Sequence, residues 1–130
     1  MYTPEIINEL PKNSIFVFGS NNLGHHTGGA AKMAIDKFGA INGVPIGLQG
    51  QSYAIITTSF NDIEISYGNI LDQVSILYQF ARLRPELTFY VTKIGCGIAG
   101  WRIETIKAIF QEFKEQQSNN IILPIEFTNQ

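Results

Sequence analysis

Two glycine-rich stretches contain the residues of this chain whose types and spacing suit ligand chemistry. The first, Gly19–Gly29, reads Gly-Ser-Asn-Asn-Leu-Gly-His-His-Thr-Gly-Gly, and the second, Gly95–Trp101, reads Gly-Cys-Gly-Ile-Ala-Gly-Trp. Glycine lets the backbone approach a ligand closely, and the first N–H groups of a helix have no partner inside the helix. Loops of this kind bind anions such as phosphate. Glycine-rich turns also occur simply to turn the chain, so one such loop alone is a weak signal.

Polar side chains of the first stretch suit a sugar phosphate. Asn21 and Asn22 can donate and accept hydrogen bonds without charge, which fits ribose hydroxyls beside a diphosphate, although asparagine also favours turns. A neutral His26 imidazole can act as a general base or hold a ribose hydroxyl, and His25 is a weaker candidate. Adjacent loop histidines are also commonly solvated or capping residues. Two histidines without a nearby carboxylate supply too few ligands, so no metal site is predicted.

Other candidates have two readings each. Cys96 lies between glycines, but no histidine is adjacent in sequence, and we expect it to pack under the loop rather than act as a nucleophile. Trp101 suits stacking on a ligand ring or packing in the core. Gln49 and Gln51 suit recognition of an adenine edge or ribose, or shaping of their own loop.

The elements that must position these loops follow from apolar periodicity. Ile15–Phe18 is wholly apolar, as in a strand buried on both faces, and Gly29–Phe38 has apolar residues at helical spacing with Gly39 at its stop. Further helices are predicted at Thr3–Leu10, from Ile70 to just before Pro85, and at Ile103–Gln116. Further strands are predicted at Tyr53–Thr58, Thr88–Ile94 and Ile121–Phe127, the last with Pro124 as an edge signal. Residues 39–52 are predicted to be a long loop, and Ser59–Glu64 a turn with a short edge pairing at Ile63–Ile65.

Alternating strands and helices predict a single α/β domain over residues 1–130, with a mainly parallel sheet and helices on both faces. Ligands bind such sheets beyond the carboxyl ends of the strands. Both glycine-rich loops follow a strand and open a helix, so both should emerge at that edge and form a diphosphate cleft. The predicted ligand-binding residues are Gly19, Asn21, Asn22, Gly28, Gly29, Ala30, Gly95, Cys96, Gly97, Ile98, Ala99, Gly100 and Trp101.

Composition excludes several classes of protein. The 130 residues are 45% hydrophobic and 15% charged, which indicates a folded chain, and a net charge of −2 gives no footprint for long nucleic acids. A single cysteine excludes an internal disulfide and a cysteine-rich zinc site. The first residues lack a signal-peptide pattern, and no apolar stretch reaches about 18 residues, so we expect no membrane span and a cytoplasmic location.

Together these segments resemble the macrodomain family, the three-layer α/β/α module that binds ADP-ribose. Thr27–Gly39 is similar to the first family loop and helix, where small residues admit the diphosphate and an asparagine, here Asn22 or Asn21, lies shortly upstream. Ile94–Trp101 resembles the second loop, which wraps the phosphates and the distal ribose, most of all in deADP-ribosylating glycohydrolases. His26 and Leu48–Ala54 are similar to segments of a macrodomain-like group of bacterial and phage proteins.

The resemblance implies a mixed, mainly parallel sheet, no cofactor, and a partner that is a small nucleotide such as ADP-ribose or an ADP-ribosylated macromolecule. Many macrodomain hydrolases have an aspartate directly after the first glycine loop, where this chain has Ala31. The glycohydrolase branch uses a lysine and an aspartate at positions that match Thr58 and Ala99 here. Those mechanisms therefore do not carry over.

Three functional hypotheses remain open. The first is an enzyme that cleaves an ADP-ribosyl or related ribose-phosphate bond, with Asn22 and His26 as catalytic residues that orient the distal ribose and a water. The second is a non-catalytic reader or sensor of ADP-ribose. The third is an unrelated nucleotide-phosphate-binding domain, but the chain has no Gly-Lys-Ser/Thr phosphate loop, so an ATPase is not expected.

Overall fold

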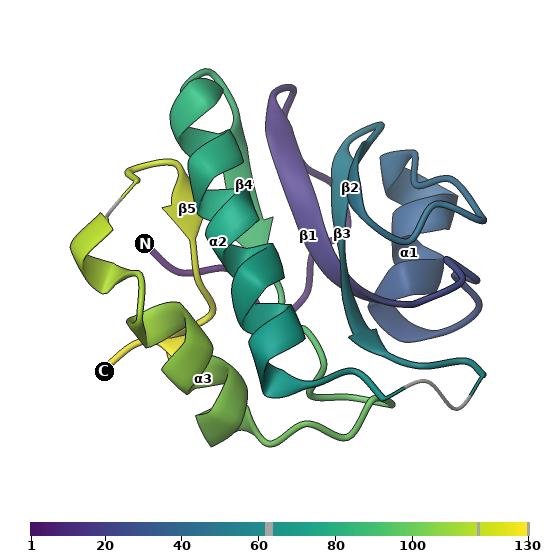
Figure 1. The fold of residues 1–130 in the computed structure, drawn as a ribbon. Helices are drawn as coiled ribbons and strands as arrows, with labels where there is room; N and C mark the ends of the chain where they lie inside the picture. The colour runs from purple at the N-terminus through teal and green to yellow at the C-terminus, as the bar shows by residue number, and fades with distance from the viewer. Residues whose placement is uncertain (62–63, 117, 130) are drawn as a thin grey trace.

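Five strands form the central sheet of the structure, a computed structural model that describes residues 1–61, 64–116 and 118–129 (Figure 1). The strands are β1 (Ser14–Asn21), β2 (Gly47–Gln49), β3 (Ser52–Thr58), β4 (Thr88–Val91) and β5 (Ile121–Ile122). Their order in the sheet is β2-β3-β1-β4-β5. All neighbouring pairs are parallel except β2 and β3, which are antiparallel. The predicted mixed, mainly parallel sheet is therefore confirmed.

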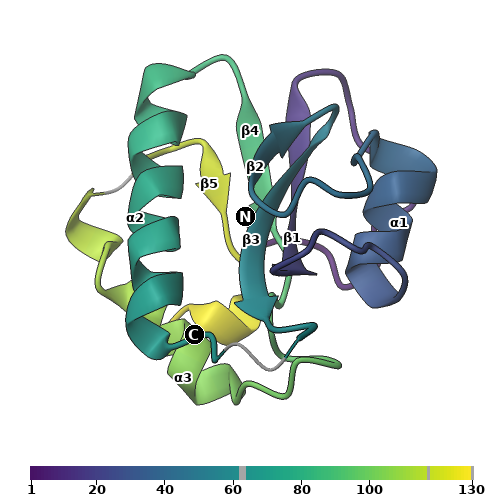
Figure 2. The same cartoon turned by 45° about the vertical axis from the view of Figure 1, so that its right-hand side comes forward.

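Three helices cover the two faces of this sheet: α1 (Gly29–Phe38), α2 (Tyr67–Leu83) and α3 (Ile103–Gln111). Successive strand side chains point to opposite faces, so β1 supplies both cores. Phe16 and Phe18 pack with the buried residues of α1, whereas Ile15 and Val17 belong to the larger core built with α2 and α3. Figures 1 and 2 show α1 on one side of the sheet and α2 and α3 on the other.

The helix that follows the first glycine-rich loop has the predicted bounds. α1 ends at Phe38, and the next residue, Gly39, has a left-handed φ of 73° and an N–H that bonds the carbonyl of Ala34. Only glycine adopts such a backbone without strain, which explains the stop. Because α1 begins at Gly29, its first turn directly follows the first glycine-rich loop.

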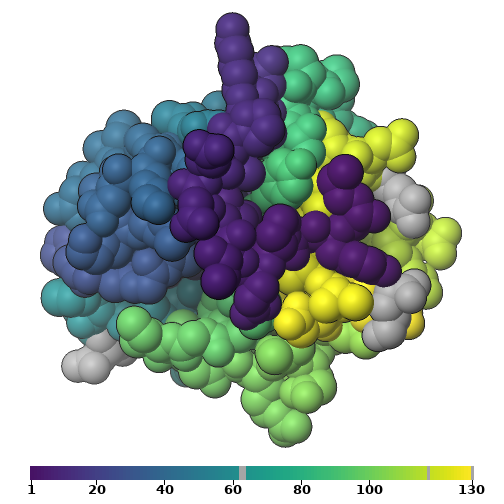
Figure 3. Space-filling model, turned by 180° about the vertical axis from the view of Figure 1, so that it is seen from behind, coloured from purple at the N-terminus to yellow at the C-terminus, as the bar shows by residue number. Residues whose placement is uncertain are grey.

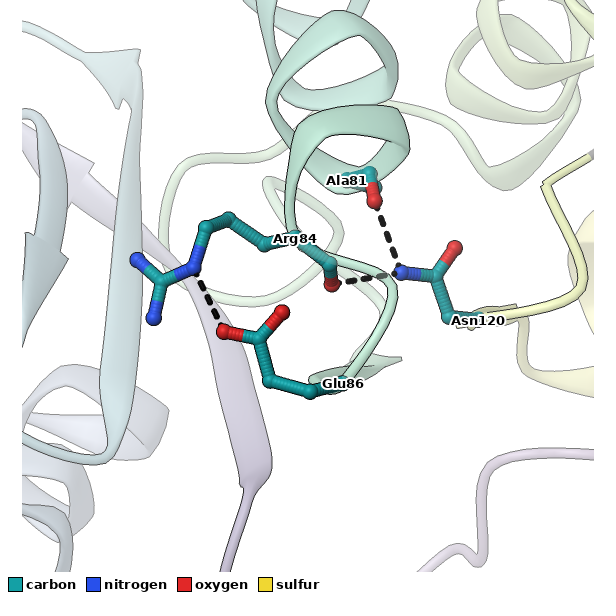
Figure 4. A network of polar contacts seen from close by, with 4 residues as sticks. All are labelled: Ala81, Arg84, Glu86 and Asn120. Carbon is teal, nitrogen blue, oxygen red and sulfur yellow. Dashed lines mark hydrogen bonds and ion pairs between the residues drawn. The ribbon is translucent and has the colours of Figure 1, made fainter.

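The end of α2 is tied to the chain just before β5 (Figure 4). Asn120 Nδ2 donates to the carbonyl oxygens of Ala81 (2.9 Å) and Arg84 (3.1 Å). Arg84 Nε also donates to Glu86 Oε2 at 2.7 Å, and this bond lowers the pKa of Glu86. One side-chain amide thus gives a second donor to two carbonyls that also accept the backbone N–H groups of Arg84 and Leu87.

The predicted helix at Thr3–Leu10 is wrong, because these residues form no regular element. Thr3 instead donates from its N–H to the Leu123 carbonyl (2.8 Å) and from Oγ1 to the Ile122 carbonyl (2.9 Å). Within this segment Ile7 is buried in the core on the α1 side, and Leu10 packs partly buried against it. A helix needs a wider apolar stripe to gain tertiary stabilisation, and here the chain end offers backbone partners instead.

Other predicted bounds also need correction. β2 lies inside the predicted loop 39–52. Of the predicted strand Ile121–Phe127, only β5 is strand, because Pro124 has no N–H for the ladder and residues 125–127 form a 3₁₀ turn. β4 ends before Ile94, and α3 ends at Gln111, with a 3₁₀ turn at Lys114–Gln116. Ile63 of the predicted edge pairing lies outside the described residues, and Ile65 is in no strand.

None of the helices in the described ranges is both long enough and apolar enough to span a membrane.

Candidate functional site

The two glycine-rich loops meet at one cavity of about 460 Å³ beyond the carboxyl ends of β1, β3 and β4. The first loop contributes residues from Asn21 to Ala31, and the second contributes residues from Lys93 to Ala99. A Cβ atom built on Gly28 would lie 3.4 Å from Ile98 Cδ1, so the loops approach to van der Waals contact. The two loops therefore meet at one edge of the sheet, as predicted.

Two glycines allow the tight approach of the segments under this cavity. A Cβ atom on Gly19 would lie 2.8 Å from Thr57 Oγ1 and 3.2 Å from the Gly95 amide nitrogen. Gly95 itself has a φ of +75°, and a Cβ atom there would lie 3.0 Å from the Trp101 ring. Any side chain at either position would push the ends of β1 and β3 away from the second loop.

Backbone N–H groups make this cavity suitable for an anion. The N-cap residue of α1 is Gly28, which has no side chain to cap the helix, and the first turn of the helix contains no acidic residue. The N–H groups of Gly29, Ala30 and Ala31, at the positive end of the helix dipole, therefore have no partner among the described residues. The amides of residues 97–99 in the opposite loop donate no hydrogen bond within the described part of the chain.

Lys93 is the single charged residue among the described residues that line the cavity. Its Nζ lies 2.9 Å from Glu5 Oε1 and 3.6 Å from Glu126 Oε2. The hydrogen bond that Lys93 donates to Glu5 raises the pKa of Lys93, so the ammonium group is charged at neutral pH. The remaining lining is neutral, and it includes the hydroxyl groups of Thr57 and Thr58.

Asn21 lines the cavity, but its side chain organises the first loop. Its Oδ1 accepts from the N–H groups of Leu23 (3.1 Å) and His25 (3.0 Å), and its Nδ2 donates to the His25 carbonyl (3.0 Å). This is the turn-forming alternative considered from the sequence. His25 also lines the cavity, and its ring meets Phe60 edge-on at 4.9 Å between centroids.

Asn22 and His26, the two residues predicted to be catalytic, do not line the cavity. Asn22 accepts from the Phe60 N–H and donates to Asn61 Oδ1, each at 2.7 Å. His26 is 3% exposed, with Nε2 3.1 Å from the Val44 carbonyl. Because a carbonyl only accepts, Nε2 carries the proton. His26 Nδ1 is buried without a partner in the described residues, and no ligand contact is open to it.

Three residues of the second loop brace it rather than face the cavity. Trp101 Nε1 donates to the Thr57 carbonyl at 2.6 Å, which ties the loop to β3. The Gly100 N–H bonds the Gly97 carbonyl at 3.0 Å and closes the turn. Cys96 Sγ donates to the Ile94 carbonyl at 3.4 Å, and burial raises the pKa of this thiol. A nucleophilic thiolate is disfavoured there.

The two glutamines shape the loop before β3. Gln49 accepts from the Ile41 N–H at 2.8 Å and donates to the Val44 carbonyl at 3.0 Å. Gln51 Nε2 donates to the Pro11 carbonyl at 2.8 Å. Neither residue lines the cavity, so the loop-shaping alternative describes both.

A second, more apolar hollow of about 440 Å³ adjoins the first. Ile7, Phe16, Met33 and Ile103 supply apolar surface to it. The two hollows share Ala30, Thr92, Lys93 and Gly97. Together they form a polar compartment beside an apolar one, with Lys93 at the junction.

Several lining residues were not singled out from the sequence. These are Ser20, Thr27, Thr92 and Lys93, together with Thr57. All but Thr27 lie at or just past the end of a strand. In a mainly parallel sheet, that position is the sequence signal for a residue near the ligand crevice. In the described ranges, no group of three His, Cys, Asp or Glu side chains could hold a metal ion.

No protein-family model matches the chain, and a search of curated proteins found no match. A functional proposal therefore depends on the geometry of the cavity and on the resemblance of its two loops.

Proposed function

We propose that this protein binds ADP-ribose or a related nucleotide diphosphate, with the pyrophosphate between the two glycine-rich loops. The observation that carries the proposal is the convergence of the uncapped α1 N-terminus, the amides of residues 97–99 and Lys93 on one cavity. Backbone donors and one cation stabilise a multiply charged anion without steric bulk. The described lining of this cavity contains no carboxylate, and Glu5, which pairs with Lys93, lines the adjoining hollow.

The adjoining apolar hollow supports a ligand that is more than a free phosphate. Binding sites for small molecules combine mostly apolar walls with a few placed polar groups. In the proposed arrangement the adenosine occupies the hollow lined by Phe16 and Met33, and the diphosphate crosses Gly97 into the polar cavity. Helices on both faces of a mostly parallel sheet support the three-layer macrodomain-like arrangement that such a ligand implies.

A non-catalytic reader or sensor is the form of this function that the side chains favour. Asn22 and His26 are engaged away from the cavity, and the positions of the family's catalytic acids and lysine hold Ala31, Thr58 and Ala99. Hydrolysis of an ADP-ribosyl bond is the second candidate. One observation favours it: His25 lines the cavity and offers an imidazole as a general base.

Titration calorimetry with ADP-ribose, AMP and NAD tests binding, and Gly97→Glu tests the site. Gly97 has no left-handed φ, and no atom lies within 4 Å of a Cβ built on it, so the chain accepts a side chain there. Because the new carboxylate would face the anion, we expect affinity for ADP-ribose to fall at least about tenfold.

Gly68→Glu is the matched control, because Gly68 is exposed in the first turn of α2 and lines neither hollow. Unchanged affinity in Gly97→Glu would remove the proposed site. Release of ADP-ribose from an ADP-ribosylated protein, assayed in parallel, separates hydrolase from reader: turnover that His25→Ala abolishes would favour the hydrolase.

A further inference from the structure

Lys93 joins the two ends of the chain at the junction of the two hollows. Its ammonium group pairs with Glu5 near the N-terminus and with Glu126 near the C-terminus. Figure 3 shows the N-terminal residues lying across this face, with the C-terminal residues beside them. The cation that lines the anion cavity is therefore neutralised by two carboxylates of the chain itself.

These ion pairs are held loosely. The Lys93 side chain is 34% exposed and that of Glu5 is 69% exposed. The pair to Glu126 is longer, at 3.6 Å. Exposed pairs contribute little to stability, since water and salt screen them. A lysine ammonium is a point charge on a flexible stem, so it can exchange one acceptor for another at small cost.

We propose that Lys93 is the residue that selects ligands by charge, exchanging Glu5 and Glu126 for the diphosphate when the nucleotide binds. This inference rests on the proposed function, and it adds that both carboxylates weaken binding by competing for the same ammonium. A charge-assisted hydrogen bond to phosphate is stronger than an exposed carboxylate pair. An uncharged nucleoside gains nothing from the exchange.

Four variants test the exchange by calorimetry with ADP-ribose and with adenosine. Lys93→Met keeps the length of the stem and removes the charge, and we expect about 10- to 100-fold weaker binding of ADP-ribose with little change for adenosine. Lys93→Arg should keep most of the affinity. Glu5→Gln should bind ADP-ribose about two- to fivefold more tightly, because one competing carboxylate is gone. Lys32→Met, which removes a surface pair to Asp36 at 2.7 Å, is the control.

Salt dependence gives a readout that a merely structural role would not move. We expect the affinity of the wild type for ADP-ribose to fall with added salt more steeply than that of Lys93→Met. If the wild type binds ADP-ribose and Lys93→Met binds it equally well with the same salt dependence, the role of Lys93 is refuted and the proposed function stands. Equal losses for ADP-ribose and adenosine would also refute charge selection. No binding by the wild type would refute both proposals.

Discussion

His26 illustrates at the scale of one residue how a loop histidine becomes part of the core. Its ring is 3% exposed, bonds the Val44 carbonyl and meets Phe18 edge-on at 5.1 Å between centroids. We expect His26→Ala to lower the free energy of unfolding by about 2 kcal/mol or more, because it removes a buried hydrogen bond and leaves a cavity. Urea unfolding followed by circular dichroism measures this loss.

His25→Ala is the comparison, because the neighbouring ring is only half-buried and lines the ligand cavity. It should cost less than about 1 kcal/mol. If His26→Ala kept the wild-type stability but lost a measurable turnover, that result would support a catalytic role for His26 and contradict the structural role described here.

The residue types in the glycine-rich loops indicated a binding site, but they did not show which way the side chains would point. The sequence places Asn22 and His26 beside the glycines, yet both side chains turn toward segments far along the chain. Asn22 reaches Phe60, and His26 reaches Val44. Such partners leave no periodic signal, whereas the glycines at 19 and 95 follow from strand ends and could be predicted.

At the scale of elements, Asn120 determines how α2 ends (Figure 4). Its side-chain amide donates to two carbonyls at that end, and its backbone carbonyl accepts from the Phe89 N–H of β4 at 2.7 Å. We expect Asn120→Ala to lower the free energy of unfolding by about 1–2 kcal/mol, because two partly buried hydrogen bonds to the end of α2 are lost. Chemical denaturation measures the change.

Asn119→Ala is the matched control for this helix end. Asn119 is adjacent in sequence and exposed, so its truncation should change stability by no more than about 0.5 kcal/mol. Equal effects of the two substitutions would show that the backbone donors of Arg84 and Leu87 satisfy these carbonyls without Asn120. Asn120→Asp should destabilise at least as much as Asn120→Ala, because its carboxylate would face two carbonyl oxygens.

Elements with strong local signals were predicted, and those without were missed. α1 has both apolar spacing and a stop glycine, and its bounds match the prediction. The Thr3–Leu10 segment had a capping pattern without an apolar stripe, and Thr3 instead donates hydrogen bonds to the carbonyls of residues 122 and 123. β2 is three residues long and forms by pairing with β3. Because glycines surround it, the sequence there indicated a loop rather than a strand.

At the scale of the whole molecule, strand order brings the site together. β1 lies between β3 and β4 and is parallel to both, so the ends of all three strands reach one edge. Alternation of strands and helices predicted the shared edge. It did not specify which strands are neighbours, because long-range pairing has no local signature. Thr57 and Lys93 lie at strand ends, but which strand ends meet around the cavity follows only from that order.

Global stability at high pH provides a test of the core between α2 and α3. Tyr78 is 5% exposed and stacks on Phe113 at 5.1 Å between centroids, and burial raises its pKa from 10.0 to about 12. The folded state therefore keeps a proton that the unfolded state loses. This contribution to stability is complete below pH 10 and is lost as the pH rises toward 12.

Tyr78→Phe removes the phenol and keeps the ring. We expect the free energy of unfolding of the wild type, relative to this variant, to fall by about 1 kcal/mol between pH 8 and pH 11. Urea unfolding at both pH values measures the difference. Tyr67→Phe, at a tyrosine that is 37% exposed at the start of α2, is the control for loss of a phenol outside the core. A wild type and Tyr78→Phe with parallel pH dependence would mean that water reaches the Tyr78 hydroxyl in the folded protein.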